Sequence, residues 1–234
     1  MHSFRKVTLA LVTACALSSG VCQSAQSDID AIERAYMNGQ TQKLTALANH
    51  HQDYEQFLAQ FRLSVAYSTH QQADKALEIV QGLITKLEAH TKKQPDDDEA
   101  LTLLAYAYSY TISLDQTVDA AAYAQQSYAA LTKAASLAPD NPRVHLVQGI
   151  LQYHTPTAYG GSKEAAKKFL QDALENYNHD VNSGVYWGHG EAHIWLGLTY
   201  LDLGNQRHAL EHFQSALALN PENGWAKYLV NINF

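Results

Sequence analysis

The sequence contains few of the residues that break or cross-link a chain. It has 5 Pro and 12 Gly among 234 residues. Because all-β folds need turn residues about every 8–12 positions, this scarcity argues against them. Hydrophobic residues make up 46% of the chain, which is too many for a disordered protein. Alanine, leucine and glutamine are abundant while β-branched residues are few, so we expect an all-α fold.

Positive charge and cysteine are scarce as well. Lys and Arg total 16 against 23 Asp and Glu, which gives a formal charge of −7. An acidic chain without a basic cluster repels phosphate backbones, so nucleic acid is not an expected partner. Cys15 and Cys22 both lie near the N-terminus, and no CxxC or spaced Cys/His array exists. We therefore expect neither a disulfide framework nor a structural zinc site.

The first 25 residues have the layout of a secretory signal. Arg5 and Lys6 precede an apolar stretch from Val7 to Leu17, and small residues follow it. This stretch is too short to span a bilayer as a stable helix. We therefore expect residues 1–25 to direct export, which in a bacterial cell means the periplasm.

The cleavage position has two interpretations. Ser18-x-Gly20 and Ala25 each fit a small-residue cleavage site, which would release a soluble protein. The run from Val12 to Cys15 also resembles a bacterial lipoprotein box, which would place a lipid on Cys15. Soluble export is the preferred interpretation, and a lipid anchor is the alternative.

The clearest internal repeat lies between His193 and Pro221. Its small and large residues recur at fixed offsets, at Leu196, Gly197, Tyr200, Ala209, Phe213, Ala216 and Pro221. Gly197 and Ala209 predict a close contact between two antiparallel helices, and Pro221 ends the second helix.

Weaker copies of the same pattern lie upstream. They occupy residues 63–83, 104–139 and 148–173. Together the copies predict four helix pairs over residues 55–234, preceded by a helical lead-in over 26–54 and closed by a capping helix from Gly224 to Phe234.

This pattern resembles the tetratricopeptide repeat family, a helix–turn–helix unit with a period of about 34 residues. The resemblance implies a right-handed α-solenoid of about four helix pairs. The insertion from His154 to Ser162, with its paired glycines, also resembles bacterial exported repeat proteins, including accessory components of TRAP-type solute transporters.

The family resemblance also implies a ligand-facing set. In such solenoids the first helix of each pair lines the concave side, and ligand contacts fall near its small residue. Carried onto this chain, these positions are Phe61, Val65, Thr102, Tyr106, Tyr110, Arg143, Leu146, Ile150, His154, Glu191, Ile194, Leu198 and Asp202.

The 12 histidines raise a metal hypothesis. His189 and His193 are four residues apart, as are His208 and His212, so each pair shares a helix face. The order around Glu191 is not the HExxH motif of zinc proteases. Surface and inter-helix histidines are the preferred interpretation, and we predict no metal and no cofactor.

No nucleophile elbow, P-loop, dinucleotide fingerprint or catalytic carboxylate pair is present. We therefore expect a non-catalytic exported module that binds a peptide segment of a partner protein, oriented by Arg143, His154 and Glu191. Two alternatives stay open: a solute-binding transporter accessory, and a metal-binding protein that uses the histidine pairs. The oligomeric state and the identity of the partner stay open too.

Overall fold

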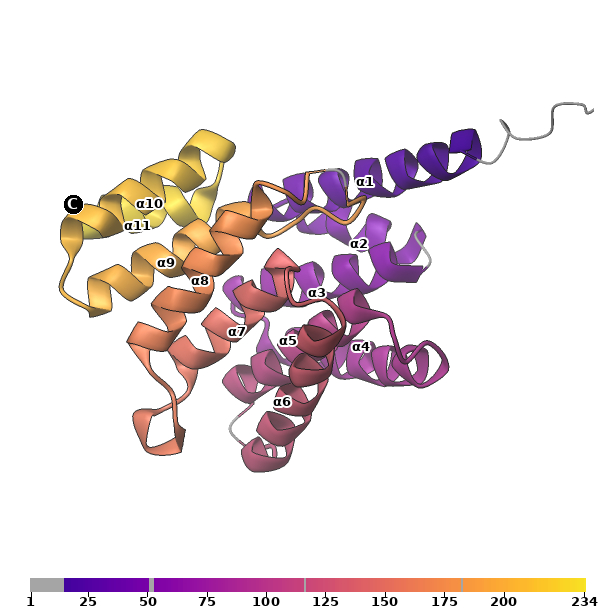
Figure 1. Cartoon of the computed structure of the whole chain (residues 1–234), viewed down its shortest axis with the longest axis horizontal. Helices are drawn as coiled ribbons and strands as arrows, with labels where there is room; N and C mark the ends of the chain where they lie inside the picture. The colour runs from indigo at the N-terminus through magenta and orange to yellow at the C-terminus, as the bar shows by residue number, and fades with distance from the viewer. Residues whose placement is uncertain (1–14, 51–52, 116, 182) are drawn as a thin grey trace, which may run out of the picture.

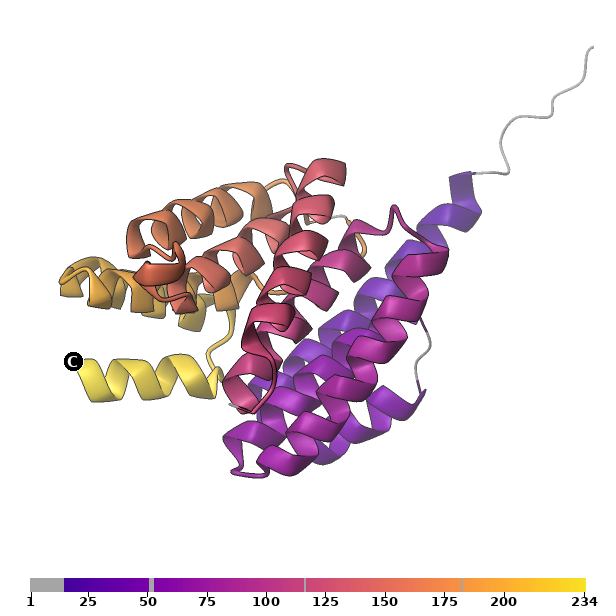
Figure 2. The same cartoon turned by 90° about the horizontal axis from the view of Figure 1, so that it is seen from below.

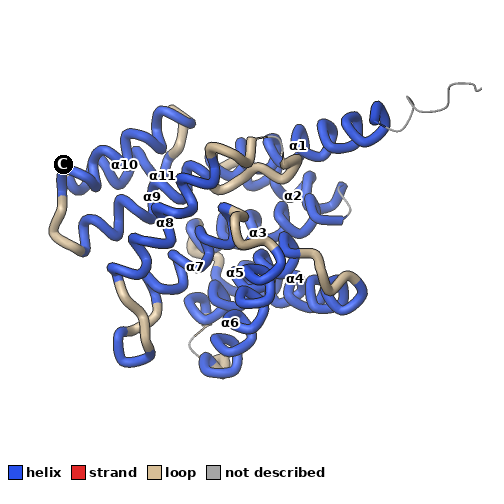
Figure 3. The backbone as a smooth tube through the Cα atoms, viewed as in Figure 1, coloured by secondary structure: helices blue, strands red, loops and turns tan. Residues whose placement is uncertain are grey.

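A computed structural model of the chain describes residues 15–50, 53–115, 117–181 and 183–234. Within these ranges the protein is all-helical, which confirms the predicted fold class (Figures 1 and 3). The α-helices are α1 (Cys15–Met37), α2 (Thr41–His50), α3 (Asp53–Thr69), α4 (Ala73–Lys93), α5 (Asp98–Leu114), α6 (Ala120–Leu137), α7 (Pro142–His154), α8 (Lys163–Tyr177), α9 (His189–Asp202), α10 (Gln206–Leu219) and α11 (Gly224–Asn233). A short 3-10 turn, Thr157–Tyr159, lies between α7 and α8.

Side-chain caps fix where several of these helices begin. An Asp, Asn or Ser just before each helix accepts a hydrogen bond from a backbone N–H of the first turn, which has no partner within the helix. The capping residues are Asp97, Asp119, Asn141, Ser162, Asn205 and Asn223. Pro142 follows Asn141 at the first position of α7, where its missing N–H costs no hydrogen bond.

The helices pack as the predicted pairs, α3 with α4, α5 with α6, α7 with α8, and α9 with α10. Small residues lie where paired helices touch. A Cβ added at Gly197 would lie 2.4 Å from a ring atom of Phe213. The hydroxyls of Ser64 and Ser127 donate to backbone carbonyls of the partner helix, each at 2.7 Å. The repeat phase read from these positions is therefore correct.

The pairs are stacked so that α1 and α2 cover α3 at one end and α11 covers α10 at the other (Figures 1 and 2). A large hydrophobic core runs from α1 to α9, and a smaller one joins α9, α10 and α11. The loop between α8 and α9 reaches back to α1, where the backbone of Tyr186 exchanges hydrogen bonds of 2.7 and 3.0 Å with the Gln26 carboxamide.

The predicted leader, residues 1–25, overlaps the first part of α1. Residues 1–14, with Arg5, Lys6 and most of the apolar stretch, lie outside the described residues. The two cleavage positions proposed from the sequence both fall within α1. Beyond them, Ile29, Ile32 and Ala35 are fully buried and fix α1 in the core. Among the described residues, no helix is both long enough and apolar enough to cross a membrane.

Candidate functional site

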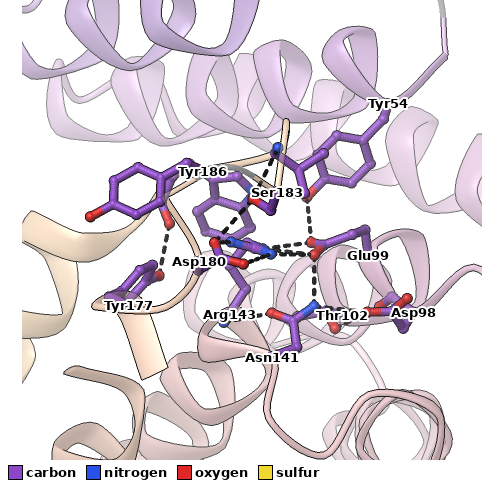
Figure 4. Close-up of polar contacts among 12 residues, drawn as sticks. Tyr54, Asp98, Glu99, Thr102, Asn141, Arg143, Tyr177, Asp180, Ser183 and Tyr186 are labelled. Atoms are coloured by element: carbon purple, nitrogen blue, oxygen red, sulfur yellow. Dashed lines mark hydrogen bonds and ion pairs between the residues drawn. The ribbon is translucent and has the colours of Figure 1, made fainter. Parts of the chain in front are cut away.

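Arg143, a predicted ligand contact, lies in the first turn of α7 within a dense ion-pair network (Figure 4). Its Nε donates to both carboxylate oxygens of Glu99 at 2.8 Å, and its Nη atoms pair with Asp180. The amide of Asn141 donates to Glu99 at 2.6 Å and to Asp98 at 2.8 Å. Burial raises the pKa of Glu99 against the opposing effect of Arg143. Arg143 thus joins α5, α7 and the loop that follows α8.

A second buried cation, Arg62, lies on α3 with no exposed surface. Its Nε donates to Glu33 at 2.7 Å, and its Nη2 lies 2.8 Å from an oxygen of Glu191. Tyr106 donates its hydroxyl to the other Glu191 oxygen at 2.5 Å. Burial alone would lower the pKa of Arg62, but Glu191 and Glu33 raise it well above its ordinary value. The cluster therefore joins side chains of α1, α3, α5 and α9.

Trp187 connects the two networks. Its indole Nε1 donates to the hydroxyl of Tyr54 at 2.8 Å, and that hydroxyl lies 3.4 Å from Glu99. Its ring lies 5.1 Å from the guanidinium carbon of Arg62. The side chain is 2% exposed. A continuous polar and aromatic network therefore runs through the protein interior from Arg62 to Arg143.

Most of the predicted ligand-facing residues lie in the protein interior, within or beside these networks. Eight of its members are buried inside the protein: Phe61, Thr102, Tyr106, Arg143, Leu146, Ile150, Glu191 and Ile194. Their side chains pack against other helices or complete the two ion-pair networks. These eight side chains lie in the interior of the structure, and their role as ligand contacts stays a prediction. In particular, Arg143 pairs with Glu99 and Asp180, and Glu191 pairs with Arg62.

Five members of the set reach the surface and stay predictions. Val65, Tyr110 and Leu198 are half-buried, and His154 and Asp202 are exposed. Tyr110 packs edge-on against the buried Phe61 ring at 5.6 Å. His154 and Asp202, the last residues of α7 and α9, lie beside a group of aromatic side chains that the sequence did not indicate.

We call this group the aromatic surface, and it comprises Tyr153, His154, Lys163, Trp195, Asp202 and Trp225. The rings of His154 and Trp195 lie 4.9 Å apart and meet edge to face. Tyr153 lies 5.3 Å from Trp195, and Trp225 lies 5.3 Å from Trp195 on its other side. The first helices α7 and α9 and the capping helix α11 thus contribute rings to one patch. None of these four rings is fully buried.

One ion pair belongs to the aromatic surface. Lys163 at the start of α8 lies 2.8 Å from Asp202 at the end of α9, and its ammonium lies 3.1 Å from the centre of the Tyr153 ring. Burial and the nearby Lys163 charge lower the pKa of His154, so its imidazole is neutral at neutral pH. The surface therefore combines apolar rings, a neutral imidazole and one paired cation and anion.

Sequence reasoning missed Tyr153, Trp195 and Trp225. The available signal was the spacing of Trp195 and Trp225, which lie about one repeat apart. The family pattern places its tryptophan at the position of His193, two residues before Trp195, so it does not indicate this pair.

The histidine pairs of α9 and α10 belong to a ladder of stacked rings. In order, its members are Tyr177, His189, His193, His212, Tyr200 and His208, with neighbouring ring centroids 4.9–5.5 Å apart. Glu191 points away from the ladder into the Arg62 network. Within the described residues, no group of three His, Cys, Asp or Glu could hold a metal ion.

Stacked helix pairs with a capping helix define a helical-repeat protein, a class whose concave faces form extended binding surfaces. Residues 190–223, which include most of α9 and all of α10, match the family model described as tetratricopeptide repeat. The chain therefore carries a tetratricopeptide repeat at residues 190–223 within a fold of stacked helix pairs.

Two solved structures show the same fold. A thermophilic tetratricopeptide repeat protein of Thermus thermophilus, TTC0263, is 20% identical, with a TM-score of 0.55 over 89% of this chain and 98% of its own. The HusA haemophore of Porphyromonas gingivalis is 20% identical, with a TM-score of 0.50 over 83% of this chain and 96% of its own. At this identity the likeness concerns the fold alone. Comparison with curated proteins gives no match.

Proposed function

We propose that this protein is a non-catalytic binding module that holds a segment of a partner protein on its aromatic surface. The observation that carries the proposal is the convergence of Tyr153, His154, Trp195 and Trp225 from the first helices α7 and α9 and the capping helix α11. Tetratricopeptide-type solenoids present binding surfaces on these helices. Half-exposed Trp and Tyr rings are the residues that most often dominate protein interfaces.

The interior supports this role by fixing the helices that carry the rings. The Arg62 network holds α9 through Glu191, and the Arg143 network holds α7 through its first turn. A surface mounted on rigid helices loses little conformational entropy when a partner binds. The paired charges of Lys163 and Asp202 at its edge contribute orientation more than affinity, because both side chains are partly solvated.

Site-directed variants test the proposal against peptides selected from a random displayed library on the purified parent protein. Trp195→Ala should weaken peptide binding by at least tenfold, since truncation of a central interface aromatic typically costs about 2 kcal/mol or more. Tyr128→Ala is the matched control, because Tyr128 is 70% exposed on α6, outside the aromatic surface. Fluorescence anisotropy gives the affinities. Equal binding by parent, Trp195→Ala and Trp225→Ala would exclude this surface as the peptide site.

A small planar ligand is the second candidate, and it develops the alternative of a solute-binding accessory. The neutral His154 imidazole beside Tyr153 and Trp195 favours it, since neutral imidazole is a ligand for metals and the rings offer flat apolar contacts. HusA, with the same fold, is by name a haemophore. Titration with haemin separates the candidates: a saturable absorbance change that His154→Ala removes supports a small ligand, and its absence favours the peptide.

We further propose that the protein is exported and acts in the bacterial envelope. The charged N-terminal segment, apolar stretch and small residues of positions 1–25 support this proposal. Intact-mass analysis of protein from fractionated cells tests it. A periplasmic species that begins after Gly20 or Ala25 supports soluble export, an N-terminal lipid on Cys15 supports the anchor, and an intact Met1 in the cytoplasm contradicts both.

A further inference from the structure

The centre of the ring ladder brings together two imidazole nitrogens from different helices. His193 on α9 and His212 on α10 face each other with their Nδ1 atoms 3.0 Å apart. As the two rings stand, one Nδ1 carries a proton and donates it to the other, so the second nitrogen offers its lone pair. No carboxylate or amide from the described residues intervenes between them.

The separation of the two nitrogens is compatible with one ion bound by both. Metal–imidazole bonds are about 2.0–2.1 Å long, so two nitrogens on one ion lie about 2.9 Å apart at right angles and about 3.3 Å apart in a tetrahedral site. The observed 3.0 Å, which is the length of the hydrogen bond between the rings, lies within this range. Adjacent positions of a square-planar or tetragonal site are typical of Cu(II) and Ni(II), and Cu(II) has the highest affinity of the divalent series.

The hydrogen bond between the two rings indicates the protonation state that a metal ligand needs. It requires one Nδ1 with a free lone pair, so at least one of the two imidazoles is neutral. Neutral imidazole is the form that binds a metal ion. His189 stacks on His193 at 5.3 Å and Tyr200 stacks on His212 at 5.5 Å, so the ladder keeps the two rings next to each other.

Both side chains are half-buried, which leaves a route for an ion and room for water at the remaining coordination positions. We propose that His193 and His212 form a copper(II) site between α9 and α10, with both Nδ1 atoms as adjacent ligands. On binding, the Nδ1 proton of the donor imidazole passes through solvent to its own Nε2, and both rings turn about their Cβ–Cγ bonds so that the two lone pairs point toward the ion. This inference does not depend on the proposed peptide or solute function.

Copper titration of the metal-free, untagged protein tests the site. With CuSO4 as the probe, we expect a first equivalent whose electron paramagnetic resonance spectrum is tetragonal, with hyperfine structure from two imidazole nitrogens. His193→Ala and His212→Ala should each weaken that first equivalent by at least tenfold in competition with a chelator. Copper should also raise the melting temperature of the parent more than that of either variant, because the ion bridges two helices.

Two control variants test whether other histidines bind the copper. His208→Ala removes the last ring of the ladder and keeps the His193–His212 pair, so it should bind copper like the parent. His145→Ala, on α7 and outside the ladder, should do the same. Circular dichroism establishes that each variant is folded, and His212→Gln replaces His212→Ala where it is not. Copper that binds His193→Ala and His212→Ala as tightly as the parent overturns the proposal, as does loss on His208→Ala alone.

Discussion

The ring of Trp187 lies 5.1 Å from the guanidinium carbon of Arg62, so a loop between α8 and α9 covers a buried cation on α3. Both side chains are almost completely shielded from water. A desolvated cation–π contact of this kind contributes about 2 kcal/mol. The same indole donates a hydrogen bond to Tyr54, which approaches the Arg143 network. One side chain thus couples two ion-pair networks that together span most of the helix stack.

Trp187→Ala should therefore be strongly destabilising. We expect the free energy of unfolding to fall by about 3–5 kcal/mol, because truncation of a buried Trp removes its packing and leaves a cavity. Here the change also leaves Tyr54 without its indole donor. Urea denaturation followed by circular dichroism measures the loss.

Trp225→Ala is the matched control for Trp187→Ala. Trp225 is half-buried on α11 and contacts Trp195 at 5.3 Å, but it takes part in neither ion-pair network. We expect a loss of about 1 kcal/mol, typical of a surface-proximal substitution. Similar losses for the two variants would mean that Trp187 does not have the central role assigned to it.

The Arg62 cluster makes a prediction about non-additivity. Arg62→Met should lower the free energy of unfolding by about 3–5 kcal/mol, because it leaves Glu33 and Glu191 as uncompensated charges in the interior. Adding Glu33→Gln and Glu191→Gln to Arg62→Met should restore part of that loss. Each of the two Glu→Gln changes alone, in the parent, should be destabilising.

Thermal and urea unfolding of the parent and these variants measure the coupling. The coupling energy of residues in one buried network typically lies between about 0.5 and 3 kcal/mol. A triple variant that loses as much stability as the sum of the single variants would show that the carboxylates are stabilised without Arg62.

Removing the predicted leader gives a third prediction. Deletion of residues 1–25 should change the free energy of unfolding by less than about 1 kcal/mol, because Ile29, Ile32 and Ala35 fix the remainder of α1 in the core. Deletion of residues 1–37 is the comparison, since it removes these buried side chains and the Glu33 partner of Arg62. A large loss from the shorter deletion would show that residues 1–25 belong to the folded domain.

Much of the fold could be predicted from the sequence, because the residues that determine it recur at fixed, short spacings. The offset of Gly197 from Ala209 predicts a close helix crossing, and the structure places Gly197 against Phe213 of the paired helix. Pro221 predicts the end of the second helix of this pair, and α10 ends at Leu219. Such signals need only the geometry of one helix pair.

The site was less predictable because burial depends on contacts distant in sequence. Arg143 and Glu191 occupy positions that face a ligand in the family pattern, but here Asp180 and Arg62 pair with them. Asp180 lies in the irregular loop between α8 and α9, and the repeat pattern places no residue of that loop. His193 and His212 were seen as members of separate pairs, since only packing of α9 on α10 brings them together.

The contact of Gly197 with Phe213 leads to the last prediction, which compares two helical glycines. In Gly197→Ala the new Cβ would lie 2.4 Å from the Phe213 ring, so the ring or the α9–α10 spacing must shift. We expect a loss of about 1–3 kcal/mol from this overpacking. Gly82 is exposed within α4, and a Cβ there meets nothing within 4 Å. Gly82→Ala should therefore raise the free energy of unfolding by about 0.5–1 kcal/mol through helix propensity. Opposite signs in urea denaturation support the assignment of Gly197 to a helix contact, and a stabilising Gly197→Ala would contradict the packing of α9 on α10.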